Sequence, residues 1–297
     1  MRAVTALLAS IARLHIVAIG ALGTLTFSWA LCGVRDVPLA LLSACDWFVV
    51  NLLNRVVDVV EDRQNGIAGA DVVARHARRT LVIGLGVLLI SLGVGALVAP
   101  QTLPVRLAFH ALGFAYNWRV LPGCDGRRRR IKELALWKNT ASALGFLFTC
   151  FALPLVSHPL VVGVDAVIAA AAFFFLFELG YEVLYDLRDV DGDRLAGVST
   201  WPVLFGPVIA ARIAVGQMVA AVVVVVAASV AGVLPWHLAI MGVAPLLQLA
   251  VVAPFLPTAT RVGRVTSSLC IGVTWLGCGL LVAYHLWDVL GLPGSGR

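Results

Sequence analysis

Acidic side chains concentrate in two short stretches of the sequence, NRVVDVVED and YEVLYDLRDVDGD. Within each stretch, polar residues recur every three or four positions: Asn54, Asp58 and Asp62 in the first, and Glu182, Asp186, Asp189 and Asp193 in the second. Positions three or four apart lie on one side of an α-helix, so each stretch is predicted to present one acidic face. Carboxylates stacked in this way repel one another, which predicts a bound cation beside them.

The candidate ligand atoms on these faces are oxygens, with no His or Cys residue among them. Oxygen-only sites suit a hard cation such as Mg2+, which keeps part of its water shell and commonly bridges one or two carboxylates to substrate phosphates. The two stretches therefore indicate a site for a phosphorylated substrate. The alternative interpretation is that both are merely solvated helix ends.

Cationic side chains lie near both acidic stretches, where a bound phosphate would need them. Three are close in sequence to the acids themselves: Arg63, Arg188 and Arg194. A further group lies in RRRRIKELALWKN, whose four arginines, 127–130, we interpret as a patch facing solvent or lipid headgroups. Lys132 and Lys138 are the only lysines, and Lys138 with Asn139 lies about one turn inside an apolar helix. An ammonium group there is costly unless it is paired or functional, and a snorkelling anchor is the alternative.

The elements that position these groups are predicted to be membrane helices. The 297 residues are 61% hydrophobic and 13% charged, with a mean hydropathy of +0.97, which excludes an ordinary soluble enzyme or a disordered chain. A transmembrane helix needs about 20 apolar residues. Nine stretches qualify: 14–34, 38–57, 80–99, 104–122, 134–156, 160–184, 204–233, 236–256 and 267–291. We therefore predict an all-α integral membrane protein of nine transmembrane helices, with residues 1–297 forming a single domain.

The distribution of positive charge predicts the orientation of these helices. Of the 22 Lys and Arg residues, all but Arg35, Arg106 and Arg297 lie in or near loops on one side of the predicted bundle. Positive residues favour the cytoplasmic side, so we predict a cytoplasmic N-terminus and cytoplasmic acidic segments at about 54–79 and 182–203. The net charge of +6 then reflects topology rather than nucleic-acid binding. A bacterial inner membrane is the expected location.

Two Asp-rich motifs on one side of a nine-helix protein resemble the UbiA superfamily of intramembrane prenyltransferases. The family pattern NxxxDxxxD matches Asn54, Asp58 and Asp62, and its second pattern, DxxxD, matches Asp189 and Asp193, with Asp186 at the usual earlier position. The segments GDRLAG and RIKELALWKN, and the Thr-x-Pro of Thr200 and Pro202, are also similar to the family. The resemblance covers nearly the whole chain.

This resemblance implies a helical bundle around a central cavity and transfer of a polyprenyl group from polyprenyl diphosphate to a hydrophobic or aromatic acceptor. The implied catalytic residues are Asp58, Asp62, Asp189 and Asp193. Mg2+ would be held by Asn54, Asp58, Asp62, Asp186, Asp189 and Asp193. The diphosphate would be bound by Asn54, Arg63, Arg130, Lys132, Lys138, Asn139 and Arg194, and the cavity wall would include Tyr116 and Tyr185.

Departures from the family pattern leave the acceptor open. The YxxxK pattern of members with aromatic acceptors is not met, because Val120 stands four residues after Tyr116. Both aromatic and lipid acceptors, in quinone, pigment or lipid synthesis, therefore remain candidates. A terpene cyclase of the same fold is one alternative. An ion-coupled transporter is another, although transporters usually place such acids near the bilayer midplane.

Overall fold

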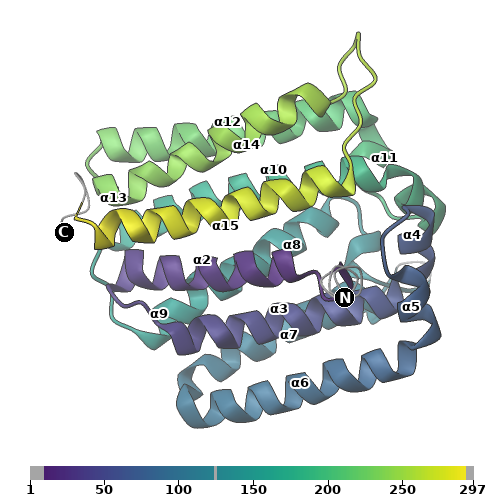
Figure 1. The fold of residues 1–297 in the computed structure, drawn as a ribbon, viewed down its shortest axis with the longest axis horizontal. Helices are drawn as coiled ribbons and strands as arrows, with labels where there is room; N and C mark the ends of the chain where they lie inside the picture. The colour runs from purple at the N-terminus through teal and green to yellow at the C-terminus, as the bar shows by residue number, and fades with distance from the viewer. Residues whose placement is uncertain (1–9, 124–125, 292–297) are drawn as a thin grey trace.

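The computed structural model describes residues 10–123 and 126–291 and consists almost entirely of helices (Figure 1). The main helices are α2 (Leu14–Cys32), α3 (Val37–Val57), α6 (Ala77–Val98), α7 (Leu103–Asn117), α8 (Trp137–Leu147), α10 (Val164–Ala196), α12 (Pro207–Val230), α14 (Val243–Val252) and α15 (Ser267–Val289). Shorter elements are α4 (Val59–Gln64), α5 (Ala70–Arg75), α9 (Leu153–Ser157), α11 (Trp201–Phe205), α13 (Trp236–Ala239) and the antiparallel pair β1 (Leu121–Pro122) and β2 (Arg128–Arg129).

Eight helical stretches in the described part of the chain are long and apolar enough to cross a bilayer, so the protein is an integral membrane protein. One of them joins α8 to α9 through a π-helical turn, Phe148–Ala152. The ninth predicted span, 104–122, forms α7, whose 15 residues extend only about 22 Å, less than the roughly 30 Å hydrocarbon core. Nine full spans are therefore not confirmed. The N-terminal residues 1–9 and Arg297 lie outside the described residues, and the orientation stays a prediction.

The helices form a closed ring. Going round it, α2 packs on α3, α3 on α7, α7 on α8, α8 on α10, α10 on α12, α12 on α14, α14 on α15, and α15 again on α2. Helix α6 packs against α3 on the periphery, where Figure 1 shows it as the outermost helix. The short helices α4, α5 and α11 lie together at one end of the bundle, which we call the α4/α11 end (right in Figure 1).

Helix α10 is longer than its apolar run. The sequence predicted a span over 160–184, whereas the helix continues to Ala196, 33 residues in all, or about 50 Å. It ends at Gly197, whose backbone is left-handed (φ 69°) and whose N–H donates to the carbonyls of Arg194 and Asp193. A residue without a Cβ adopts this conformation at little cost. The second acidic stretch is therefore helical throughout and reaches the α4/α11 end.

The first acidic stretch is not one continuous helix, contrary to the sequence prediction. Helix α3 ends at Val57, Asp58 has φ −96° and ψ 21°, and α4 begins at Val59. Helical hydrogen bonds persist across the break, with the Asp58 N–H donating to the Asn54 carbonyl and the Asp62 N–H to the Asp58 carbonyl. The carboxylates of Asp58 and Asp62 nevertheless have different partners, so they do not act as one face.

A buried ion-pair network joins α3, α6 and α7. Arg106 is fully buried and donates from Nε to Asp46 Oδ2 at 2.8 Å and from Nη1 to the Ser91 carbonyl at 2.9 Å. His110 Nε2 lies 2.9 Å from Asp46 Oδ1. Arg106 is one of the three basic residues predicted to lie away from the cytoplasmic loops, and its side chain is buried between helices rather than exposed in a loop. The reason is that Asp46, one residue in a neighbouring apolar run, supplies its counter-charge.

The close approach of α6 to this network depends on Gly95. A Cβ added at Gly95 would lie 2.2 Å from Arg106 Nη1, and Arg106 is hydrogen-bonded to both Asp46 and Ser91 and has little freedom to move. Gly95→Ala is expected to lower the free energy of unfolding by about 1 to 3 kcal/mol. Gly93→Ala, on the same helix and with no described atom within 4 Å of the added Cβ, is the matched control and should change it by less than about 0.5 kcal/mol. Chemical denaturation in micelles compares the two; equal stability of both variants would contradict the prediction.

Candidate active site

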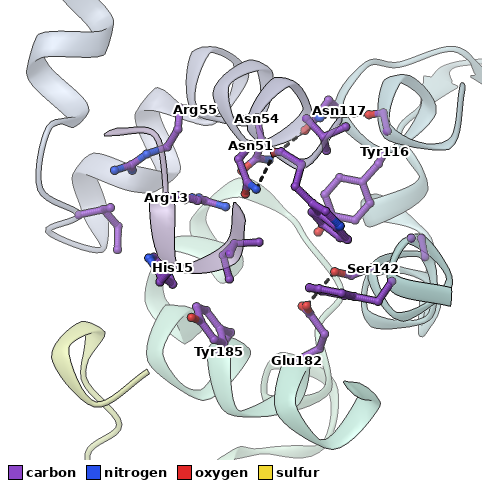
Figure 2. Close-up of a pocket in the computed structure, with 18 of the residues that line it drawn as sticks. Arg13, His15, Asn51, Asn54, Arg55, Tyr116, Asn117, Ser142, Glu182 and Tyr185 are labelled. Carbon is purple, nitrogen blue, oxygen red and sulfur yellow. Dashed lines mark hydrogen bonds between the residues drawn. The ribbon is translucent and has the colours of Figure 1, made fainter. Parts of the chain in front are cut away.

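A cavity of about 260 Å³ lies inside the ring and is lined by residues of α2, α3, α7, α8, α10 and α15 (Figure 2). Polar groups line part of it, including Arg13, His15, Asn51, Asn54, Arg55, Tyr116, Asn117, Ser142, Glu182, Tyr185 and Arg188. The remaining wall includes the aromatic rings of Trp47, Phe109 and Phe146. We call this space the polar cavity.

Asp58 of the first motif lies in a buried cluster with a second acid, Glu61, and two cations, Arg130 and Lys132. The Lys132 ammonium group contacts the carboxylates of Asp58 and Glu61, the latter at 2.8 Å. The Arg130 guanidinium group lies 3.4 Å from each of the same two carboxylates. Asn54 donates to Asp58 Oδ2 at 2.6 Å, as its spacing four residues earlier predicts. Arg130 is thus buried in the cluster and is not part of the solvated arginine patch that we inferred for 127–130.

Burial and neighbouring charges shift the pKa values of two glutamates in this cluster, Glu61 and Glu133. Desolvation by burial, together with the adjacent Asp58 carboxylate, raises the pKa of Glu61. Partial burial acts in the same direction on Glu133, but hydrogen bonds from Arg130 and Arg119 outweigh it and lower the pKa of Glu133. The Glu133 carboxylate thus accepts hydrogen bonds from both Arg119 and Arg130, while the Lys132 ammonium group opposes the rise in the pKa of Glu61.

Asp62 has a different set of partners. Its Oδ2 accepts a hydrogen bond from Arg55 Nη1 at 2.6 Å, and its Oδ1 lies 3.7 Å from Arg13 Nη2. Arg55 also donates to the carbonyls of Ser10 and Ala68, which ties the loop after α4 to the start of the chain's described part. Arg13 and Arg55 both line the polar cavity.

The second motif is built around Lys138. Its ammonium group lies 2.8 Å from Asp186 and 2.9 Å from Asp193, so a residue at the start of α8 bridges two carboxylates of α10. The Arg188 guanidinium pairs with the neighbouring Asp189. The second oxygen of Asp186 is buried and has no hydrogen-bond partner among the described residues.

Each motif carboxylate is therefore held by a Lys or Arg side chain in this structure. Within 10–123 and 126–291, no three His, Cys, Asp or Glu residues are close enough together to hold a metal ion as a preformed cluster. The donor set itself fits Mg2+, because it consists of carboxylate and amide oxygens. The unpartnered oxygen of Asp186 is in addition available to a cation. Metal binding would require the acids to exchange some of their contacts with the basic side chains.

Of the seven predicted diphosphate-binding residues, only Asn54 lines the polar cavity, and two of the other six are exposed on the surface. Arg63 is half exposed and pairs with the exposed Asp71 at 2.8 Å. Arg194 is exposed and lies 3.8 Å from Asp191. Asn139 is buried, and Tyr116 and Tyr185 line the polar cavity from α7 and α10. Arg63 and Arg194 were chosen for their sequence proximity to Asp62 and Asp193, but adjacent helical residues face different directions.

Several lining residues were not predicted from the sequence. Arg55 stands between the motif acids, where an intervening position gives no signal of its own, whereas Arg188, one of the cations that the sequence places beside the acids, does line the cavity. Ser142 donates to Glu182 at 2.7 Å across the cavity between α8 and α10 (Figure 2). Glu182 had been noted only as part of the acidic stripe, although its spacing from Asp186 was the signal that could have placed it here. His15 also lines this cavity, although it lies outside both acidic stretches of the sequence.

The chain and its fold resemble known proteins of one family. The fold is similar to that of a UbiA homolog from Archaeoglobus fulgidus bound to DMAPP and Mg2+, with 15% identity, coverage of 94% of this chain and 97% of that chain, and a TM-score of 0.72. The same values hold for that homolog bound to GPP and Mg2+. A UbiA homolog from Aeropyrum pernix K1, in its apo structure, is 17% identical over 93% of this chain and 98% of that chain, with a TM-score of 0.60. No curated protein matches the sequence.

At these identities, the structural similarities establish the fold alone. The family assignment depends on the sequence itself, because the model of the UbiA prenyltransferase family matches residues 6–262, most of the chain. The matched range contains both Asp motifs and the segment between them. The protein therefore belongs to the UbiA prenyltransferase family.

Proposed function

We propose that this protein is a Mg2+-dependent prenyltransferase that moves a polyprenyl group from polyprenyl diphosphate to an aromatic or lipid acceptor. The observation that carries the proposal is the arrangement of charge next to the polar cavity, whose lining residues Asn54, Arg55 and Arg188 contact the motif acids. The acids of both motifs and their basic partners gather at the α4/α11 end, and an apolar path leads away from them into the bundle. One substrate with an anionic head and a hydrocarbon tail fits both parts.

The path that leads from the acids into the bundle is a series of three cavities. The polar cavity shares Ile16, Phe146 and Glu182 with a second space of about 80 Å³, the middle cavity. The middle cavity in turn shares six lining residues, among them Phe27, Phe174 and Leu281, with a third space of about 250 Å³, the outer cavity. The outer cavity lies between α10, α14 and α15. This path supports binding of an isoprenoid chain by apolar contact.

The basic residues would bind and activate the diphosphate. Lys132, Arg130 and Lys138 are already paired with carboxylates, so an arriving diphosphate can replace an acid as their partner without leaving a charge bare. Mg2+, held by Asn54, Asp58, Asp62, Asp186, Asp189 and Asp193, would add neutralisation of the departing diphosphate. Cleavage of the C1–O bond leaves allylic cation character on the chain, which the rings of Tyr116 and Tyr185 and the Glu182 carboxylate are placed to stabilise.

The location of the protein in the cell follows from the same proposal. Residues 1–297 would form one domain in the bacterial inner membrane, with the α4/α11 end facing the cytoplasm. Most Lys and Arg residues fall in loops of that side, which supports this orientation. A water-soluble diphosphate head would then meet the site at the cytoplasmic surface while its tail enters the bundle.

Pyrophosphate release from protein in nanodiscs tests the proposed reaction. Farnesyl, geranylgeranyl and longer polyprenyl diphosphates would be supplied with or without a bacterial membrane-lipid extract, and with Mg2+ or with EDTA. The expected result is release that requires both Mg2+ and the extract, because the acceptor is a membrane component and Mg2+ neutralises the leaving group.

Other outcomes would contradict the proposal. Release without the extract, together with a cyclic hydrocarbon product in mass spectrometry, would indicate a terpene cyclase. Release that persists in EDTA would exclude a role for Mg2+. No release from any donor, combined with ion flux through the protein in liposomes, would indicate a transporter.

A further inference from the structure

The middle cavity contains two polar groups that the proposed reaction does not use. Glu178 of α10 is 5% exposed, and Gln248 of α14 is 3% exposed. Both line the middle cavity from helices that neighbour it on different sides. The Oε2 atom of Glu178 and the Oε1 atom of Gln248 are buried and have no hydrogen-bond partner among the residues that the structure describes.

The other polar side chains nearby are satisfied. Tyr181 bonds to the Cys270 carbonyl at 3.0 Å and to Thr274, and the Thr274 hydroxyl also donates to the Cys270 carbonyl. The Gln248 amide nitrogen contacts the Val273 carbonyl at 3.5 Å. The Glu178 and Gln248 oxygens therefore differ from these neighbouring groups in having no hydrogen-bond partner among the described residues. A buried polar group without a partner costs on the order of 1 to 3 kcal/mol, and within a membrane bundle a carboxyl group usually marks a functional position.

The position of Glu178 separates it from the metal-binding motif. It precedes Asp186 by eight residues, which places it about 12 Å further along the helix axis, away from the α4/α11 end. It also precedes Glu182 by one turn, and Glu182 forms part of the wall between the polar and middle cavities. Glu178 and Gln248 thus lie on the path of the isoprenoid chain, beyond the reach of its diphosphate.

We propose that Glu178 and Gln248 form a second, deeper binding subsite for a hydroxyl group carried on an isoprenoid chain. Most of the remaining wall is apolar, with Phe27, Phe174 and Phe177 among it, which favours a hydrocarbon with one small polar group over a hydrated ion. A hydroxyl group both donates and accepts, so it can donate to the Gln248 amide oxygen and accept a hydrogen bond from the Glu178 carboxyl group in its protonated form.

The subsite lies on the chain path of the proposed prenyltransferase and in that respect rests on the proposed function. Binding of an isoprenoid alcohol needs neither Mg2+ nor turnover, so the two proposals are tested separately. Loss of pyrophosphate release with intact alcohol selectivity would reject the reaction alone. Normal release without selectivity would reject the subsite alone.

Equilibrium titration of the protein in nanodiscs, corrected with empty nanodiscs and without Mg2+, measures the selectivity. The probes are farnesol and its hydrocarbon counterpart farnesene. The expected result is about fivefold tighter binding of farnesol, the ratio that one additional buried hydrogen bond produces. The double variant Glu178→Leu with Gln248→Leu should lose this preference and still bind farnesene, which reports an intact cavity. Glu178→Gln, which keeps a hydrogen-bonding group, should retain it.

A matched control is Gln217→Leu. The Oε1 atom of Gln217 is also buried and unpartnered within the described chain, but the residue lines none of the three cavities. This variant should keep the full preference for farnesol. Equal affinity for farnesol and farnesene in the wild type, or an unchanged preference in the double variant, would overturn the proposal.

A second arm identifies which substrate carries the hydroxyl group. Farnesyl diphosphate with a hydroxyl on its terminal isoprene unit is compared with the unmodified diphosphate. Tighter binding of the hydroxylated donor, lost in the double variant, assigns the group to the donor chain. Farnesol selectivity that persists when unmodified farnesyl diphosphate is saturating assigns it to a separate membrane alcohol. Absence of selectivity in both arms rejects the subsite.

Discussion

Replacement of Asp58 with Asn is expected to lower the rate of pyrophosphate release at least about 100-fold while the protein remains folded. The Asp58 carboxylate contacts Lys132 and Arg130 and accepts a hydrogen bond from Asn54. Asn has nearly the same volume but no charge, so it removes a ligand for Mg2+ and leaves Lys132 with Glu61 alone, while Arg130 keeps Glu61 and Glu133. The structure of the cluster should survive, whereas its ability to organise a metal and a diphosphate should not.

The matched control for this variant is Asp71→Asn. Asp71 carries the same charge and also pairs with an arginine, Arg63, but its side chain is 77% exposed, whereas Asp58 is buried. We expect release within about twofold of the wild type for this control, because exposed ion pairs contribute little. Thermal unfolding of both variants in nanodiscs checks that each is folded. A rate for Asp58→Asn within about threefold of the wild type would remove Asp58 from the site.

Replacement of Arg106 with Met is expected to lower the free energy of unfolding by about 3 to 5 kcal/mol, because it leaves a buried carboxylate without its cation. Arg106 is the centre of the network that joins α3, α6 and α7, and Asp46 is almost fully buried beside it. Within this network, Asp46 lies on the same helix as Asn54 but 12 residues before Asp58, away from the diphosphate region. The variant should therefore affect stability first, and activity only through loss of folded protein.

Two further variants separate this effect from a general effect of removing an arginine. Arg35→Met removes the ion pair between Arg35 and Asp288. These two side chains are 36% and 21% exposed, so the free energy of unfolding should fall by less than about 1 kcal/mol. The triple variant Asp46→Leu, Arg106→Met, His110→Leu removes all three ionisable groups and should recover much of the lost stability. Unfolding in bicelles measures all three. A cost of under about 1 kcal/mol for Arg106→Met would show that Asp46 has other compensation.

The positions of the membrane helices followed from the lengths of the apolar runs. The predicted span 38–57 and the observed α3, Val37–Val57, differ by one residue, and α15 begins at Ser267 as predicted. Apolar runs determine such bounds because every backbone polar group in the bilayer must be bonded within its own helix. The same argument predicted too early an end for α10, because charged residues stop an apolar run without stopping a helix.

The composition of the site was partly predictable for a similar reason. Local spacing predicted the contact between Asn54 and Asp58, and the cost of a charge in an apolar helix singled out Lys138. Local spacing does not report direction, so Asp58 and Asp62 were expected on one face and instead have different partners across the break at Asp58. Neither Arg63 nor Arg194 lines the polar cavity.

The sequence by itself determined that the chain is a membrane bundle with two acidic motifs, because hydropathy and helical spacing are local properties. Only the tertiary structure decided which cations neutralise which acids. Lys132 lies 74 residues after Asp58, and Lys138 lies 55 residues before Asp193. It also decided that Arg106 is internal and that Glu178 and Gln248 share a cavity. Such pairings depend on how separate helices close into a ring, and no local pattern in one helix carries that information.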